Sequence, residues 1–183
     1  MKKTVLTFGL ISGAIMALMM FATLPFIEKI GFDKGVIIGY TTMVLSFLLV
    51  FFGIRSYREN VGGGTITFGR ALAVGILITL VSCICYVVAW EIIYFKFMPD
   101  FVAKYTAYAV EKVKASGASP EAIQAKLQEM KKFRAMYDNP FVNAAITFTE
   151  PFPIGLIITL VSALILRKKS NPQPAESPAA AEA

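Results

Sequence analysis

Long apolar runs separated by short polar segments dominate the pattern along the chain. A helix needs roughly 20 predominantly apolar residues to cross a hydrocarbon core about 30 Å thick, and four runs reach that length. They are Thr4 to Ile27, Val36 to Ile54, Ala71 to Phe97 and Phe141 to Leu166. The pattern therefore predicts an all-α, polytopic membrane protein with four transmembrane helices.

The segment between the third and fourth runs has the pattern of water-exposed helices. Ser119-Pro120-Glu121 is typical of a helix start, because serine caps a helix, proline fits its first turn and an acid there complements the helix dipole. Apolar residues recur at helical spacing on both sides of Gly117. We expect an amphipathic helical hairpin inserted between helices 3 and 4.

These elements divide the chain into four parts. Residues 1–97 hold transmembrane helices 1 to 3 of a single membrane domain, 98–140 form the extramembrane hairpin, and 141–169 form transmembrane helix 4. Residues 170–183 are rich in proline, alanine and serine without periodicity, so we expect a disordered tail. A short turn over residues 28–35 is expected to make helices 1 and 2 antiparallel neighbours.

Composition supports the membrane interpretation and narrows the chemistry. Hydrophobic residues make up 56% of the 183 residues, which is too apolar for an ordinary soluble domain. The net charge of +6 comes from basic residues that flank the apolar runs, which favours a topology signal over nucleic-acid binding. Histidine is absent, which excludes histidine-based metal sites and Ser-His catalysis. We expect no enzymatic activity, no cofactor and no metal site.

The basic residues also bear on orientation. With both termini in the cytoplasm, the cytoplasmic side holds Lys2, Lys3, Arg55, Arg58, Arg70, Arg167, Lys168 and Lys169. The opposite side holds a comparable number, most of them spread over the hairpin. Because the first group is packed at the helix ends, the distribution favours cytoplasmic termini.

An offset of eighty residues aligns helices 3 and 4. Residues 75–82 read Gly-Ile-Leu-Ile-Thr-Leu-Val-Ser, and residues 155–162 read Gly-Leu-Ile-Ile-Thr-Leu-Val-Ser. The likeness is either an inverted duplication of the kind found in transporters, or chance among sequences built from few residue types. In both cases the small residues mark faces for close helix contact inside the bundle or, alternatively, for homodimerisation. The packing residues expected from this pattern are Gly9, Gly13, Gly75, Thr79, Ser82, Gly155, Thr159 and Ser162.

Acids at membrane depth are the candidate functional groups, since a charged side chain in hydrocarbon is costly. Glu91 and Glu150 both fall towards the outer ends of their helices. Pro151 and Pro153 lack amide donors, so they either break helix 4 and free carbonyls for an ion site, or simply start the helix. Both acids point away from the small-residue faces, and Glu91 beside Trp90 also fits an interfacial anchor. The candidate ion or partner site is Glu91, Glu150, Pro151 and Pro153.

Four motifs together resemble a known family. They are Gly-Thr-Ile-Thr-Phe-Gly-Arg-Ala at 64–71, Phe-Met-Pro-Asp-Phe at 97–101, Asn139-Pro140, and Phe-Thr-Glu-Pro-Phe-Pro-Ile-Gly at 148–155. On these motifs the chain is similar to the bacterial family catalogued as domain of unknown function 4199, over nearly its whole length up to Lys169. The resemblance implies a four-helix bacterial inner-membrane protein without an assigned activity, and it carries over no active-site residue.

The expected function is therefore that of an integral inner-membrane protein that is non-enzymatic and binds a protein partner or self-associates. The alternative is a small oligomeric carrier or channel that uses the outer carboxylates as an ion or proton site. A lipid-modifying enzyme has the least support, because few ligands or nucleophiles are available without histidine. The expected partners are the lipid bilayer and either a second copy or another membrane protein, and not nucleic acid.

Overall fold

The computed structural model describes residues 1–168, and the predicted tail at 170–183 lies outside them. Over the described residues the regular structure is helical apart from an isolated antiparallel bridge between Ile66 and Lys168, so the predicted all-α class is confirmed there. In chain order the elements are α1 (Lys2–Thr23), the 3-10 helix η1 (Leu24–Phe26), α2 (Ile27–Asn60), α3 (Phe68–Ile92), the π-helical turn η2 (Ile93–Phe97), α4 (Phe101–Ala115), α5 (Pro120–Tyr137), α6 (Pro140–Phe148) and α7 (Pro151–Leu166).

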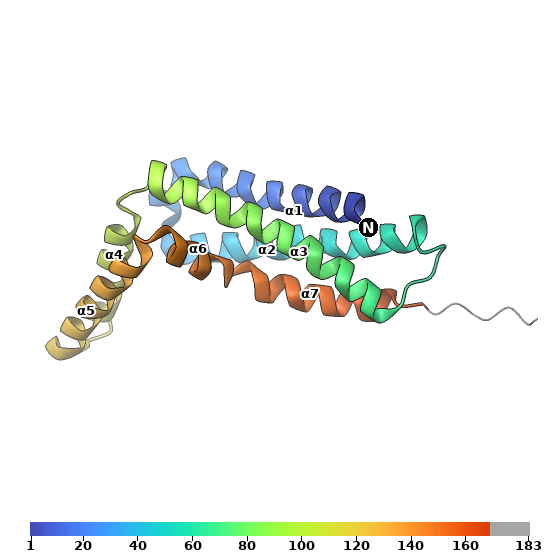
Figure 1. Cartoon of the computed structure of the whole chain (residues 1–183). Coiled ribbons are helices and arrows are strands. Elements are labelled where there is room, and N and C mark those ends of the chain that lie inside the picture. Colours follow the sequence, from blue (N-terminus) through green and yellow to red (C-terminus); the bar gives the residue numbers. More distant parts are fainter. Residues whose placement is uncertain (169–183) are drawn as a thin grey trace, which may run out of the picture.

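Four long helical stretches form one bundle: α1, α2, α3 and the consecutive pair α6 and α7 (Figure 1). α3 packs on α1 and α7, and α2 packs on the same two helices. α4 and α5 run side by side away from one end of the bundle, while Met1, the α2–α3 connection and the end of α7 lie at the other end (Figure 1). One end of the bundle therefore carries the α4–α5 pair, and the other end carries Met1, the α2–α3 connection and the end of α7.

Three helices among the described residues are long and apolar enough to cross a membrane: Lys2–Asn60, Phe68–Phe97 and Pro140–Leu166. The first of them contains α1, η1 and α2, and Figure 1 shows the chain reversing its direction between α1 and α2.

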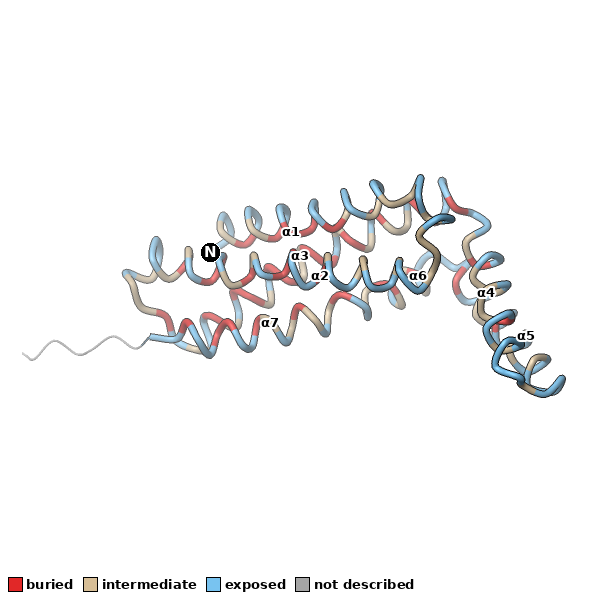
Figure 2. The backbone as a smooth tube through the Cα atoms, turned by 180° about the vertical axis from the view of Figure 1, so that it is seen from behind, coloured by how far each residue is buried: buried red, intermediate tan, exposed pale blue. Residues whose placement is uncertain are grey.

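The outer faces of the bundle are strongly apolar. Buried residues follow the inner faces of the helices, whereas the outward faces are exposed (Figure 2). Leu18, Ile37 and Ile165 on those outward faces are 68%, 66% and 66% exposed. Soluble monomers rarely expose apolar surface on this scale, whereas lipid accommodates it. The molecule therefore has the surface of a membrane protein.

The turn between α1 and α2 begins earlier than the sequence indicated. α1 ends at Thr23, because Pro25 has no amide to donate to the carbonyl four residues before it. Gly31 then has φ 72° and ψ 165°, a backbone conformation that is essentially restricted to glycine. The turn thus covers residues 24–31 rather than 28–35, and the helix continues unbroken from there to the end of α2.

α4 and α5 are joined through Gly117, which has a positive φ of 75°. Ser119 caps α5 by accepting a hydrogen bond from the amide of Ala122, as its place before proline indicated. The two helices pack on each other along one side. A small buried cluster connects them to the bundle: Tyr94, Val102 and Tyr137.

Candidate functional site: a cleft ending at Glu150

The fourth long stretch consists of two helices, α6 and α7, separated by Thr149 and Glu150. Pro151 is the first residue of α7, and neither it nor Pro153 can donate a hydrogen bond to the carbonyl four residues before it. The structure combines the two alternatives for these prolines, because the fourth stretch is interrupted before Pro151 and Pro151 starts the second helix. One carbonyl expected to be free is nevertheless paired, because the Glu150 amide donates to the Thr147 carbonyl at 3.3 Å.

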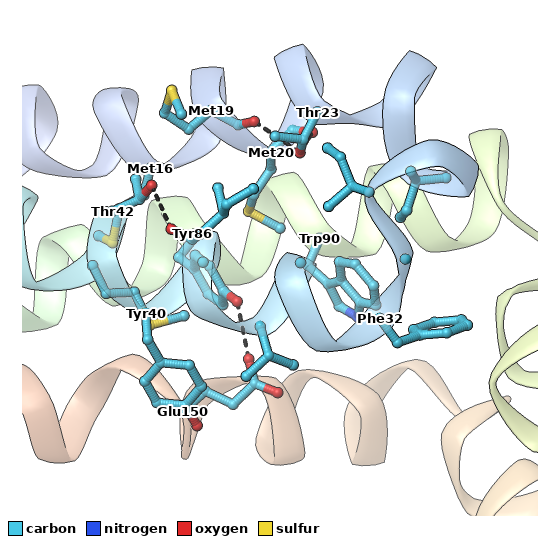
Figure 3. Close-up of a pocket in the computed structure, with 18 of the residues that line it drawn as sticks. Met16, Met19, Met20, Thr23, Phe32, Tyr40, Thr42, Tyr86, Trp90 and Glu150 are labelled. Atoms are coloured by element: carbon cyan, nitrogen blue, oxygen red, sulfur yellow. Dashed lines mark hydrogen bonds between the residues drawn. The ribbon is translucent and has the colours of Figure 1, made fainter. Parts of the chain in front are cut away.

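Glu150 in this break contacts α3. The hydroxyl of Tyr86 donates a hydrogen bond to Glu150 Oε2 at 2.9 Å (Figure 3). Tyr86 itself is buried, whereas the Glu150 side chain is exposed. Within residues 1–168 no lysine or arginine forms an ion pair with Glu150. The carboxylate is therefore held by a neutral donor and keeps an accessible side.

An apolar cavity of about 240 Å³ lies beside this pair (Figure 3). Its walls come mainly from α1, α2 and α3, and they include the flexible side chains of Met16, Met19, Met20 and Met43. Gly35 and Gly39 of α2 also line it, and a Cβ atom at either glycine would meet open space. Among the described residues that line this cavity, Glu150 is the one charged side chain.

A second, larger space of about 850 Å³ lies beneath α4 and α5. It shares six lining residues with the first: Phe32, Val36, Tyr86, Trp90, Phe101 and Glu150. The two spaces therefore meet, and we refer to them together as the Glu150 cleft. In its outer part Lys112 pairs with Asp33 at 3.0 Å and Lys126 pairs with Glu129 at 2.9 Å.

Aromatic side chains hold α4 and α5 over the cleft. Phe32 of α2 packs edge-on against Phe101 and Tyr105 of α4, with ring centres 5.9 Å and 5.4 Å apart. Trp90 of α3 donates its indole N–H to the hydroxyl of Tyr137 at the end of α5, at 2.9 Å. These contacts position the roof of the cleft relative to the bundle.

Glu91 is placed differently from Glu150. It follows Trp90 on α3 but lines neither part of the cleft, and its Oε1 is buried without a hydrogen-bond partner among the described residues. Burial raises the pKa of the Tyr137 hydroxyl, and the carboxylates of Glu150 and Glu91 act in the same direction. Both acids therefore lie within electrostatic reach of Tyr137, but the structure gives them no common cavity. Of the two prolines in the candidate site, Pro151 is buried and Pro153 is exposed.

The small-residue faces of α3 and α7 meet each other. Gly75 lies directly against the side chain of Thr159, and Gly155 lies directly against the side chain of Thr79. The two threonine hydroxyls are 3.1 Å apart and hydrogen-bonded. Adding eighty to 75 gives 155, and subtracting eighty from 159 gives 79, so the offset turns the first contact into the second. A two-fold axis between antiparallel helices requires this relation. This is the relation expected for an inverted pair.

α1 uses the same kind of contact on α3. Gly9 lies against Val81, and Gly13 lies against Cys85. The hydroxyl of Ser82 donates to the carbonyl of Gly9 at 3.1 Å. All eight residues expected to pack helices are buried in the single chain. These faces are therefore occupied within the bundle.

A family model places the chain among known sequences. The model described as "Protein of unknown function (DUF4199)" matches residues 7–168. The chain belongs to this family. No curated protein and no solved structure matches it. Every residue that lines the Glu150 cleft falls inside the matched range, so the cleft is part of the DUF4199 region itself.

The groups available at the cleft limit what this DUF4199 protein can do there. In the part of the chain that the structure describes, no three His, Cys, Asp or Glu side chains come together as a metal site would require. The inner cavity of the cleft offers one carboxylate, tyrosine hydroxyls, aromatic ring faces and a large apolar wall. Such a set is suited to holding an apolar molecule and orienting it by one polar group.

Two further polar residues of this DUF4199 protein were not found by reasoning from the sequence. Asn143 donates from Nδ2 to the carbonyl of Tyr137 at 3.1 Å, and Thr147 donates to Asn143 Oδ1 at 3.1 Å. Both are buried, and they connect α6 to the end of α5 beside the cleft roof. The sequence contained a signal for Asn143, which is an amide side chain in an apolar run, because a buried amide has to find hydrogen-bond partners. Tyr86 gave no comparable signal.

Proposed function

We propose that this chain is a non-enzymatic component of a bacterial inner membrane that crosses the bilayer four times and acts by binding a partner molecule in the Glu150 cleft. The observation that carries the proposal is the cleft itself: its inner cavity is apolar, Glu150 is the one charged side chain among the described residues of that cavity, and aromatic side chains roof the outer part. Ligand sites in proteins usually have this form, with a few placed polar groups in an apolar pocket. An ionisable residue at membrane depth is also a functional group by default.

The chain reversal supports four crossings. α1 has 22 residues, and a helix of that length spans about 33 Å. The part of α2 that follows Gly31 is longer still, and it runs back alongside α1. Each is long enough to cross a hydrocarbon core of about 30 Å, so Lys2–Asn60 supplies two of the four crossings.

The distribution of charge supports cytoplasmic termini. Basic residues flank the helix ends at the bundle end that holds Met1, the α2–α3 connection and the end of α7, an end that Figure 1 shows. Those in the described chain are Lys2, Lys3, Arg55, Arg58, Arg70, Arg167 and Lys168. Cytoplasmic segments next to transmembrane helices carry an excess of lysine and arginine. α4 and α5 then stand on the periplasmic side, with the Glu150 cleft beneath them.

The packing of small residues supports binding in the cleft over self-association through those residues. Glycine-rich faces drive helix dimers when they are free at the lipid surface. Here Gly9, Gly13, Gly75 and Gly155 already contact side chains of the same chain. A partner of this protein therefore finds its open surface in the cleft and at α4 and α5.

Site-specific photo-crosslinking tests this function. The photoreactive residue p-benzoylphenylalanine would replace Val36, which lines both parts of the cleft, and the matched control would replace its neighbour Ile37, which lines neither. The two side chains are similarly exposed, at 58% and 66%. In membranes of the native host we expect an adduct of defined mass at Val36 and not at Ile37. Equal adducts, or none at Val36, contradict the proposal.

The helix break favours a second candidate function, a small oligomeric carrier or channel with Glu150 as its ion or proton site. Discontinuous helices beside a polar group at membrane depth are how transporters build such sites. The test is cation and proton flux into liposomes for the wild type, Glu150→Gln and the control Glu91→Gln. A carrier function requires flux that falls in Glu150→Gln and persists in Glu91→Gln. Unchanged flux in Glu150→Gln excludes it.

A further inference from the structure

The charge, aromatic side chains and shape of the cleft indicate which class of molecule it binds. The inference drawn from them rests on the binding function proposed above. We propose that the Glu150 cleft is a site for a lipophilic cation: a single hydrophobic chain with an ammonium head group. The chain occupies the methionine-lined cavity, and the ammonium lies against the carboxylate of Glu150.

The first argument is charge complementarity. Glu150 is the one charged side chain among the described residues that line the apolar cavity. Its Oε2 accepts a hydrogen bond from Tyr86, while Oε1 accepts none from residues 1–168. An ammonium group supplies the missing positive partner in a setting where an unpaired carboxylate is costly. An anionic head group would instead meet a like charge.

The second argument concerns the aromatic side chains around this carboxylate. Tyr40 of α2 and Tyr86 and Trp90 of α3 line the cavity together with Glu150 (Figure 3). The faces of aromatic rings attract cations, and sites for quaternary ammonium groups are commonly built from them. Rings and a carboxylate in one cavity therefore favour an alkylammonium over a neutral alcohol of the same length.

The third argument separates a single-chain amine from a membrane phospholipid. A phospholipid head group carries a phosphate, which needs lysine or arginine partners. The described lining of the apolar cavity contains neither, and the two lysines in the outer part, Lys112 and Lys126, are paired with acids. The observations thus favour a ligand with one positive charge and no phosphate.

The shape of the cavity suits a flexible chain. Methionine side chains adapt to the outline of what they contact, and four of them form its walls. Gly35 and Gly39 leave open space where other residues would place a side chain. A volume of about 240 Å³ accommodates an alkyl chain.

The experiment measures equilibrium binding of tritiated decyltrimethylammonium to the full chain in phosphatidylcholine nanodiscs, with empty nanodiscs subtracted. Decyl sulfate and decanol are the competitors, because they keep the chain and change the charge. We expect saturable binding of one probe per protein, displaced by unlabelled cation and not by decyl sulfate. Glu150→Gln should weaken binding about tenfold or more, while the control Glu91→Gln, outside the cleft, should stay within about twofold.

A second variant tests the chain-binding part of the site without touching the acid. Gly39→Leu places a side chain in the open space of the cavity and is expected to weaken binding of the decyl probe about tenfold or more. Gly39 lies within α2, where leucine is a better helix former than glycine, so this variant is expected to fold even if Glu150→Gln does not. Thermal unfolding of each variant accompanies the binding data.

The outcomes separate this inference from the function on which it rests. Displacement by decyl sulfate or decanol as effective as by the cation, or full affinity in Glu150→Gln, overturns the lipophilic-cation site. If Gly39→Leu still blocks the binding of decyl sulfate or decanol, the cleft remains a binding site for another class of ligand. The same conclusion follows if a phospholipid forms the adduct at Val36. If no probe binds and Val36 gives no adduct, both proposals fail.

Discussion

At the scale of single residues, the contact between Tyr86 and Glu150 is the side-chain hydrogen bond found for the Glu150 carboxylate within residues 1–168. An acid in a water-poor setting is stabilised by any donor that reaches it, and the described residues provide one hydroxyl. The contact joins α3 to the break between α6 and α7, which are distant in sequence. Its loss would therefore affect both the acid and the relative position of two helices.

We expect Tyr86→Phe to lower the free energy of unfolding by about 0.5–1.5 kcal/mol, the range for one hydrogen bond in a membrane protein. Thermal or denaturant unfolding in mild detergent measures the change. Tyr40→Phe is the matched control, because the Tyr40 ring lines the same cavity and no hydrogen bond of its hydroxyl is found in residues 1–168. An equal loss in both variants would show that the Tyr86 hydroxyl has no special role.

The α3–α7 contact makes a second prediction at this scale. Gly75→Ala forces a methyl group against Thr159, whose branched side chain is stiff in a helix. Overpacking of this kind costs about 1–3 kcal/mol, more than the gain in helix propensity. Gly35→Ala, where a Cβ atom meets open space, should be neutral or stabilising by up to about 1 kcal/mol. Unfolding midpoints that fall equally for both would contradict the close contact.

The residues of the site were only partly predictable from the sequence. Glu150 and the two prolines stand out, because an acid and missing amides in an apolar run break local rules. Tyr86 does not, since a tyrosine in an apolar helix is ordinary until the rotation of α3 against α6 and α7 is known. The same rotation distinguishes Glu150, which lines the cleft, from Glu91, which does not.

At the scale of elements, local chemistry determined how well each boundary was predicted. The start of α5 follows from the capping serine and the proline after it. The end of α1 depends on Pro25 inside an apolar run, where length alone suggested that the helix continues to Ile27. The π-helical turn η2 has no sequence signal of this kind, since it arises where α3 meets the α4–α5 pair.

The α1–α2 turn gives a prediction for Gly31. We expect Gly31→Ala to destabilise the protein by about 1–3 kcal/mol, because alanine is strained in the backbone conformation that Gly31 adopts. The surroundings are open, so the effect comes from the backbone and not from a clash. Gly39→Ala, at an open helical position, serves as the control in the same unfolding assay. A similar loss in both would mean that the turn relaxes without strain.

The α4–α5 pair gives a further prediction, about what holds it on α2. The Lys112 ammonium donates hydrogen bonds to the Tyr108 hydroxyl and to the Asp33 carboxylate, and both raise the pKa of Lys112. This ion pair therefore persists through neutral pH and weakens as alkaline pH deprotonates the lysine. Exposed ion pairs still contribute little to stability. Phe32→Ala removes ring contacts instead and should cost about 1–3 kcal/mol.

Hydrogen exchange compares the two kinds of contact directly. Phe32→Ala should speed exchange of the amides of α4, whereas Lys112→Met should leave it nearly unchanged at neutral pH. If Lys112→Met releases α4 to the same extent, the exposed ion pair rather than the aromatic contact holds the roof of the cleft.

At the scale of the whole molecule, the proposed four crossings predict which segments are accessible from outside the cell. In a background with Cys83 and Cys85 replaced by alanine, single cysteines at Lys34 and Ser116 should react with an impermeant maleimide on intact cells. A cysteine at Asn60 should react only after permeabilisation. The reverse labelling pattern would show the opposite orientation in the membrane. Labelling of Asn60 and Ser116 from the same side would show that α3 does not cross the membrane.

The reciprocal contact between α3 and α7 has a consequence for how such sequences can change over time. Gly75 packs against Thr159, and Gly155 packs against Thr79. A larger residue at one position of a pair therefore requires a smaller residue at the other. We expect these positions to covary in pairs among family members, with the pair 75 and 159 exchanging volume. A glycine and a threonine could even trade places without loss, while either substitution alone would be selected against.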